Sequence, residues 1–292
     1  MRALPLTLLL VITTLPIAVP ALGDLPDVPH YPWLLEAEDG PTAPLSDLVA
    51  PPRGFARVPA SPHSLAGWMR DLPVRTDRTE VHAYDGRELS SPSAHVVALD
   101  VGVRDLQQCA DSAIRLLSEY AWATGRADEL AWDFTSGDRT RWADWLAGER
   151  FVIGRTVERR VGAARSNTRS TFRRWLDLVF TYAGTRSIAR EGEAVGDKPV
   201  EAGDVYVSAG SPGHAVIVVD VATHSDGRRA ALLAQGYMPA QELHILRARR
   251  DAISPTLDGI WFVLPTTADG VLDTPSWAPF RAGDARRIAP VR

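Results

Sequence analysis

The sequence contains little of several residue types that often mark a function. Cysteine occurs once, at Cys109, and lysine once, at Lys198. A single cysteine excludes an internal disulfide and leaves three roles for the thiol: a reactive group, an intermolecular bridge or a small buried side chain. Basic residues do not outnumber acidic ones, since the chain has 32 Lys and Arg and 36 Asp and Glu. A mildly acidic chain with scattered arginines is a poor nucleic-acid binder, so we expect no nucleic-acid partner.

Patterns typical of bound metals and nucleotides are also missing. The histidines other than His214 show no ligand spacing such as His-Glu-x-x-His, so we expect no metal and no cofactor. These histidines are His30, His63, His82, His95, His224 and His244. The turn Gly210–Gly213 leads into a strand and lacks the Lys-Ser/Thr of a phosphate loop, which excludes that interpretation.

A long apolar run occurs only within the first 23 residues. Arg2 precedes the run Leu4–Val19, and Ala21-Leu22-Gly23 has the small-x-small pattern of a signal-peptide cleavage site. Pro5 and Pro16 disfavour a retained membrane helix, and no later run is long enough to span a bilayer. The sequence therefore predicts a signal peptide over residues 1–23, export to the periplasm or the extracellular space, and no stable membrane span after cleavage.

Proline density and hydrophobic periodicity divide the remaining chain. Residues 24–60 are rich in proline and predict an extended N-terminal arm. Residues 61–292 predict a single α+β domain, because helices come first and a run of antiparallel strands follows. Long helices are expected over Asp105–Thr124, with Asp105 as N-cap, and over Ser170–Tyr182. Strands are expected at His95–Val101, Asp204–Ser208, Ala215–Val221, Ala230–Ala234 and Ile260–Leu264, and the C-terminal residues are expected to wrap the surface.

Cys109 and His214 form the candidate catalytic pair. Cys109 lies near the start of the first long helix, where the dipole and the unpaired N–H groups favour a thiolate. His214 follows a tight turn at the start of an apolar strand, where an imidazole would serve as the base for the thiol. Gln235 ends the adjacent strand, and its amide oxygen would hold the imidazole in one tautomer.

Other roles stay open for these residues. Gln107 or Gln108 would donate a side-chain amide to a developing oxyanion, or would only cap the helix. Cys109 also falls among the apolar positions of its helix, so a buried, inert thiol fits the same pattern. His214 and Gln235 fit equally well as buried hydrogen-bonding residues. A hydrolase built instead on carboxylates is a weaker alternative, drawing on Asp100, Asp105, Glu119 or Asp204.

Four segments stand out as a set: Asp105–Asp111, Tyr182–Thr185, Gly210–Ala215 and Gln235–Gln241. Together they resemble the bacterial family called domain of unknown function 4846, and the resemblance extends from about residue 52 to residue 280, including Thr274–Trp277. The resemblance implies an exported bacterial protein and no established activity.

A second resemblance concerns the histidine-bearing strands. Gly203–Val207 followed by His214–Val219 is similar to papain-like, NlpC-type cell-wall peptidases. In those enzymes a cysteine at a helix N-terminus precedes the histidine, and a third polar residue lies on the next strand, an order that Cys109, His214 and Gln235 match. The resemblance implies a papain-like fold with the cysteine helix packed on an antiparallel sheet. Two features depart from it: Gln108 and Ala110 flank the cysteine in place of an Asp-Cys-Ser start, and the Cys-to-His interval is long.

These observations predict an exported cysteine hydrolase that cleaves an amide or ester bond in peptidoglycan or another envelope component. The alternative is a non-catalytic envelope protein that binds glycan or a protein partner, with Cys109 in the core. Accessibility of the thiol in the folded chain distinguishes the two.

Overall fold

The computed structural model of the protein describes residues 30–35, 40–267 and 269–289, so the predicted signal peptide over residues 1–23 lies outside the described residues. The α-helices are α1 (Leu45–Leu48), α2 (Leu65–Arg70), α3 (Cys109–Ala123), α4 (Trp142–Leu146), α5 (Arg169–Tyr182) and α6 (Thr185–Glu191). Short 3-10 helices are η1 (Pro32–Leu35), η2 (Ala127–Glu129) and η3 (Ala282–Asp284).

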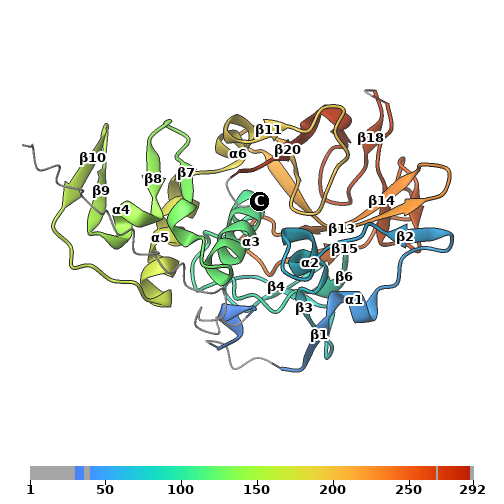
Figure 1. Ribbon diagram of the computed structural model, residues 1–292, viewed down its shortest axis with the longest axis horizontal. Coiled ribbons are helices and arrows are strands. Elements are labelled where there is room, and N and C mark those ends of the chain that lie inside the picture. Colours follow the sequence, from blue (N-terminus) through green and yellow to red (C-terminus); the bar gives the residue numbers. More distant parts are fainter. Residues whose placement is uncertain (1–29, 36–39, 268, 290–292) are drawn as a thin grey trace, which may run out of the picture.

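A ten-stranded antiparallel sheet is the largest sheet of the described residues, with β11, β20, β12, β13, β14, β15 and β6 as neighbours along its main path (Figure 1). Its strands are β2 (Phe55–Arg57), β6 (Ser93–Val96), β11 (Glu193–Ala194), β12 (Val205–Ser208), β13 (His214–His224), β14 (Arg229–Gln235), β15 (His244–Leu246), β16 (Thr256–Leu257), β17 (Trp261–Val263) and β20 (Ala285–Arg287). Smaller two-stranded pairs are β1 (Thr42–Pro44) with β3 (Pro73–Arg75), β4 (Val81–His82) with β5 (Glu88–Leu89), β7 (Ala131–Asp133) with β8 (Arg139–Arg141), β9 (Glu149–Ile153) with β10 (Val157–Val161), and β18 (Val271–Leu272) with β19 (Phe280–Arg281). Helices packed on a large antiparallel sheet confirm the predicted α+β class.

Both faces of β13 are covered, which explains its almost unbroken apolar sequence. Ala215 and Ile217 belong to one buried cluster with the residues of α3, whereas Val216 and Val218 belong to a second cluster on the other face. Side chains alternate between the two faces of a strand, so each face receives every second residue. The second cluster is closed by residues such as Phe280 of the C-terminal segment.

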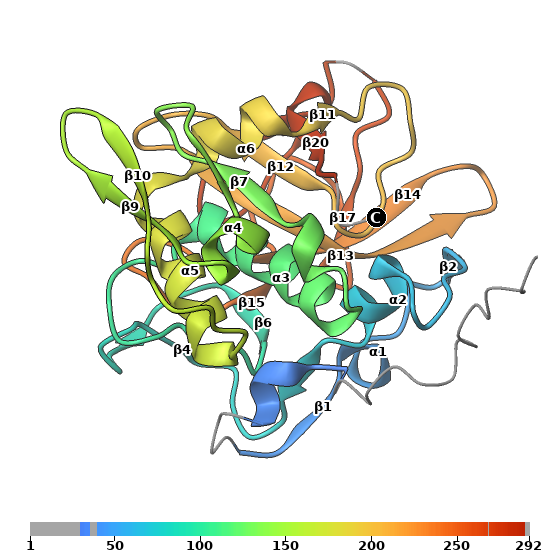
Figure 2. The ribbon, with the colours of Figure 1, turned by 60° about the vertical axis from the view of Figure 1, so that its left-hand side comes forward.

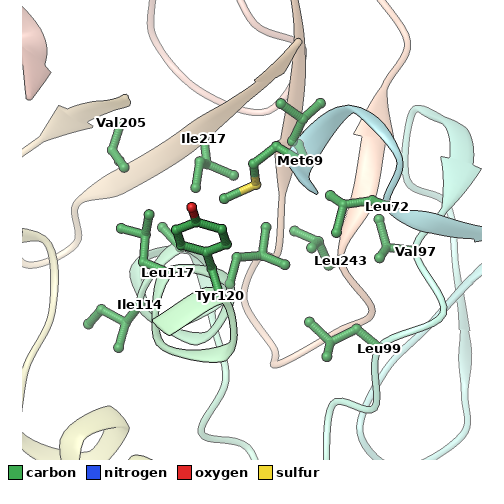
Figure 3. Packing of buried hydrophobic residues seen from close by; sticks show 14 of the residues in the cluster. Met69, Leu72, Val97, Leu99, Ile114, Leu117, Tyr120, Val205, Ile217 and Leu243 are labelled. Atoms are coloured by element: carbon green, nitrogen blue, oxygen red, sulfur yellow. The ribbon is translucent and has the colours of Figure 1, made fainter. Parts of the chain in front are cut away.

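Helix α3 lies at the centre of the molecule, against β13 and between α2 and α5 (Figure 2). Every residue from Cys109 to Ala121 is buried, including polar and charged ones. Figure 3 shows the ring of Tyr120 reaching from α3 toward Ile217 of β13 and Met69 of α2. The helix ends at Ala123 with Thr124 as its C-cap, and Gly125 follows with a φ of 70°, the left-handed conformation that glycine adopts most easily at a helix end.

The expected start of this helix at Asp105 is wrong, because Gln108 is the N-cap and Cys109 is the first helical residue. The carboxylate of Asp105 does not cap the helix. Its Oδ1 accepts hydrogen bonds from the Ala240 backbone N–H at 2.6 Å and from Gln108 Nε2 at 3.0 Å. Asp111 caps the helix instead, since its Oδ2 accepts from the Gln108 backbone N–H at 3.1 Å. The thiol therefore sits at the position where a helix leaves its N–H groups unpaired.

Three other expectations also differ from the structure. The strand expected over His95–Val101 ends at Val96, and Val97 makes only an isolated bridge with Val74. The C-terminal residues do more than wrap the surface, because β20 pairs with β12 within the main sheet. The predicted N-terminal arm is not extended throughout, because it contains η1, α1 and β2, and β2 pairs with β13. Its Trp33 is buried and donates its indole N–H to the carbonyl of Ala98.

An ionic network centred on the buried Arg115 and Glu119 joins α3 to α5. Arg115 donates to Glu119 at 2.7 Å and to Asp100 at 3.0 Å, and it is 1% exposed. Arg169 of α5 contacts both carboxylate oxygens of Glu119, at 2.7 and 2.8 Å. Arg173 of α5 reaches the other oxygen of Asp100 at 2.5 Å. Because Arg115 and Glu119 are buried charges, removing either one would leave its partners with an uncompensated buried charge.

Candidate active site

Cys109 opens α3 at the edge of a groove of about 530 Å³. The groove lies between the start of α3, the turn Gly210–Gly213, the residues that lead into α6, and Met238. The Cys109 residue is 7% exposed, and its Sγ lies 3.9 Å from the carbonyl oxygen of Gly213. The sulfur thus lies against the backbone that leads into β13, at one wall of the groove.

The surroundings of the thiol act on its pKa in opposite directions. Burial raises the pKa of Cys109 to about 11, and the nearby carboxyl of Asp111 adds to the increase. The backbone N–H groups of Ala215, Ala110 and Cys109 itself lower that pKa, though by less. The resting sulfur is therefore a thiol at neutral pH, and a reactive thiolate would need a base to take its proton.

His214 and Gln235 lie side by side, buried at the ends of β13 and β14. His214 Nε2 is 2.9 Å from Gln235 Oε1, the contact that the sequence indicated. The amide nitrogen of Gln235 faces two further groups, the hydroxyl of Ser276 at 2.9 Å and Nε2 of His244 at 3.4 Å. The other nitrogen of His244, Nδ1, lies 3.0 Å from the carbonyl oxygen of Glu242.

This chain of contacts fixes both imidazole tautomers. A carbonyl oxygen only accepts, so His244 Nδ1 must donate to Glu242, which leaves its Nε2 as an acceptor for the Gln235 amide. Gln235 Oε1 likewise only accepts, so His214 Nε2 must carry a proton. The Nδ1 of His214 then holds a free lone pair, and it has no hydrogen-bond partner within the described part of the chain.

Aromatic rings enclose the imidazole of His214. The ring centroids of Tyr237, Trp277 and Phe280 lie 5.1, 5.3 and 6.0 Å from that of His214. Burial lowers the pKa of His214 to about 4, although the hydrogen bond to Gln235 opposes the decrease. Burial also lowers the pKa of His244 to about 4. Both imidazoles are therefore neutral at pH 7, the protonation state that the hydrogen-bond chain requires.

The structure places the thiol beside the backbone of His214, and no hydrogen bond joins Cys109 Sγ to His214 Nδ1 among the described residues. The imidazole belongs to the side of the sheet that carries Phe280, whereas the following residue, Ala215, packs with α3. Cys109 and His214 thus lie at the same end of β13, with the imidazole directed to the face of the sheet away from α3.

The two glutamines before the cysteine differ in position. Gln107 is fully buried in the ionic network, where its Oε1 accepts from Arg115 at 3.2 Å and its Nε2 contacts the carbonyl of Asp100 at 3.4 Å. Gln108 lines the groove, but its amide nitrogen donates to Asp105. Neither side chain is directed toward the thiol by a hydrogen bond, so the backbone N–H groups at the start of α3 are the nearer donors for an oxyanion.

The carboxylates considered from the sequence are engaged elsewhere. Glu119 and Asp100 belong to the ionic network, and Asp204 accepts two hydrogen bonds from Arg287, at 3.0 and 2.8 Å. Asp111, which no sequence pattern marked as functional, is the carboxyl nearest in sequence to the thiol. It is 6% exposed, its Oδ1 has no hydrogen-bond partner within the described residues, and burial raises its pKa well above the usual value.

Within the described residues, no group of three or more His, Cys, Asp or Glu side chains is arranged to hold a metal ion. In the same ranges, none of the helices combines the length and hydrophobicity needed to cross a bilayer.

Comparison with known proteins gives one result. A family model described as domain of unknown function (4846) matches residues 45–287, which confirms the family resemblance seen in the sequence. No curated protein and no solved structure matches the chain. Because the matched residues make up most of its length, the chain belongs to the domain of unknown function 4846 family.

Proposed function

We propose that this protein is an exported cysteine hydrolase with a papain-like arrangement of its site, acting on an amide or ester bond of peptidoglycan or another envelope component. Cys109 is the nucleophile, His214 the base and Gln235 the residue that orients it. The proposal rests on one observation above all. The hydrogen-bond chain through Gln235 leaves Nδ1 of His214 unprotonated and without a partner among the described residues, one residue from the backbone that contacts the thiol.

The chemistry follows from that arrangement. Nδ1 takes the thiol proton, and the sulfur attacks the carbonyl carbon of the substrate while the backbone N–H groups at the start of α3 stabilise the oxyanion. The imidazolium returns the proton to the leaving amine or alcohol, and water then hydrolyses the thioester and regenerates the thiol. The step requires the His214 side chain, which lies on the side of the sheet away from α3, to turn until Nδ1 contacts Sγ. The substrate-free protein must also reach this position if His214 is to activate the thiol.

The deciding experiment measures alkylation of Cys109 by iodoacetamide at pH 7 in the folded protein. The proposal predicts that the wild type reacts about 10–100 times faster than His214→Asn, because the imidazole takes the thiol proton. His63→Asn, at an exposed histidine, serves as the matched control and should react like the wild type. Equal rates in the wild type and His214→Asn would contradict the proposal, as would a thiol that reacts only after unfolding.

A second candidate function is the non-catalytic envelope protein that binds glycan or a protein partner. The burial of Cys109, its raised pKa and the missing contact with Nδ1 favour it. Incubation of the protein with peptidoglycan and its stem peptides, followed by mass spectrometry, separates the two candidates. New fragments that disappear with Cys109→Ala support the hydrolase, whereas unchanged substrate together with binding to the polymer supports the second candidate.

A further inference from the structure

A second cavity, of about 440 Å³, lies toward the other end of α3. Tyr120, on its wall, stands about 16 Å along the helix axis from Cys109. No residue of the cavity wall also lines the groove beside Cys109. The cavity is therefore a separate site, and a ligand bound there is independent of the proposed hydrolase chemistry.

The cavity arises from the way two strands share one edge of β13. Strand β12 pairs with the first part of β13, from His214 to Ile217, and β2 pairs with its last part, from Ala222 to His224. Asp220 and Val221, on the intervening stretch, line the cavity. The rest of the wall comes from the chain after β2, from the start of α2 and from the residues before β12, and much of it is apolar, with Val58, Pro59, Ala60, Leu65, Ala66 and Ala202.

Most charged side chains on this wall are already paired. Arg70 contacts Asp220 at 2.9 Å, and Asp220 also accepts from Arg57 at 2.7 Å. Glu201 lies 3.4 Å from Arg287. The hydroxyl of Tyr120 donates to the carbonyl of His63 at 2.9 Å. Each of these groups therefore already has a partner within the protein.

Arg229 is the exception on this wall. It is half-buried, and within the described residues its guanidinium makes no hydrogen bond and no ion pair. Glu201 and Asp204 are close enough to raise its pKa, but burial outweighs them and lowers it. A guanidinium carries five N–H donors, and no nitrogen of Arg229 is among the fully buried, unpaired polar atoms of the described residues, so these donors still reach water at the cavity wall. A bound carboxylate would replace that water in a charge-assisted contact.

We propose that this cavity binds a small amphiphilic carboxylate, with the carboxylate on Arg229 and an aliphatic or aryl body on the apolar wall. The planar fork of arginine matches a carboxylate in a two-point contact. The cavity has the volume of ordinary small-molecule sites. Its partly apolar wall disfavours a small, fully hydrated anion such as acetate, which would gain little from burial.

Calorimetric titration with octanoate, octanamide and acetate tests the proposal. The wild type should bind octanoate at least tenfold more tightly than octanamide, and acetate should not bind measurably. Arg229→Gln should abolish the difference between octanoate and octanamide, whereas Arg228→Gln, at the exposed neighbour paired with Asp226, should keep it. The absence of saturable octanoate binding to the wild type would overturn the proposal, as would equal octanoate affinity in Arg229→Gln.

A second variant tests the same cavity in case Arg229→Gln does not fold. Ala60 lies in the loop between β2 and α2 and lines the cavity. Ala60→Trp should fill part of the cavity and weaken octanoate and octanamide alike by about tenfold, since it removes space rather than charge. Unchanged octanoate affinity in this variant would place the ligand elsewhere and overturn the assignment.

Discussion

Gln235 lies between two buried histidines, with its amide oxygen 2.9 Å from His214 Nε2 and its amide nitrogen 3.4 Å from His244 Nε2. The amide therefore donates to the unprotonated Nε2 of His244 and accepts from the protonated Nε2 of His214, so the tautomer of His244 determines that of His214. The origin of this order is the carbonyl of Glu242, a fixed backbone acceptor for His244 Nδ1. A single main-chain group thus determines which nitrogen of His214 is available as a base.

Replacing this amide by a carboxylate tests the relationship. In Gln235→Glu a negative charge would face both imidazoles, and it favours their protonated forms. We expect the pKa of His214 and of His244, each about 4 in the parent, to rise by one unit or more. An NMR titration of the imidazole carbon resonances measures both values. Unchanged titrations would mean that Gln235 does not control either ring.

A neutral, apolar replacement at the same position should act on stability. Gln235→Leu would leave His214 Nε2, His244 Nε2 and the Ser276 hydroxyl without their buried partner. We expect the free energy of unfolding to fall by about 2–4 kcal/mol, since each unsatisfied buried group costs about 1–3 kcal/mol. Urea denaturation measures the change. A loss below about 1 kcal/mol would show that water replaces the amide, contrary to the buried setting of His214 and His244.

Asp111→Asn should lower the pKa of Cys109. The carboxyl of Asp111 is the second cause of the raised thiol pKa, after burial, and the substitution removes its charge. Asparagine keeps an oxygen that accepts from the Gln108 backbone N–H, so the start of α3 should survive. The pH profile of alkylation should move to lower pH, with a rate at pH 8 roughly threefold or more above that of the wild type. An unchanged pH profile of alkylation would show that Asp111 carries no charge in the folded protein.

The parts of the fold predicted well are those with strong local patterns. The apolar run before Asp220 identified β13, and the turn at Asp226-Gly227 placed β14 beside it, which was enough to bring Gln235 to His214. Periodicity also gave α5 to within one residue at its start. These elements are determined by residues close together in the sequence, and hydrophobic spacing reports such contacts directly.

Contacts between distant residues were not predictable in the same way. Asp105 looked like an N-cap, but Ala240, far along the chain, donates its N–H to that carboxylate. No sequence pattern linked His244 to His214. The connection from β14 to β15 is not a tight turn, so the sequence does not fix the register in which the two strands pair. The burial of Cys109 depends on the turn Gly210–Gly213 from another part of the chain, so the sequence left its role open.

The two buried histidines should make stability depend on pH. Their pKa values are about 4 in the folded chain and about 6.5 when unfolded. Between pH 4 and pH 6.5 the unfolded chain binds more protons than the folded chain. The free energy of unfolding is therefore highest above pH 6.5 and falls by about 3 kcal/mol for each histidine as the pH decreases toward 4. Glu191 acts in the opposite direction, because burial raises its pKa to about 7 and favours the protonated folded form at lower pH.

Comparison with a variant separates the histidines from other groups. In His244→Asn, the loss of stability between pH 6.5 and 4 should be smaller by about 3 kcal/mol than in the wild type. His63→Asn, at an exposed position, should leave the loss unchanged. Urea denaturation across this range supplies the curves. Parallel curves for the wild type and His244→Asn would contradict a buried neutral His244.

Glu119 is the carboxylate on which the ionic network between α3 and α5 depends. It is fully buried, and both Arg115 and Arg169 donate to it. Glu119→Gln preserves shape but removes the negative charge between two guanidiniums, so we expect a loss of about 3–5 kcal/mol in the free energy of unfolding. Glu129→Gln, which removes an exposed partner of Arg126, should have no measurable effect. A similarly small effect of Glu119→Gln would mean that the arginines find solvent or other anions when the carboxylate is absent. The large difference expected between these two substitutions follows from the burial of Glu119 and from its two arginine partners, since Glu129 is exposed and, among the described residues, pairs with Arg126 only.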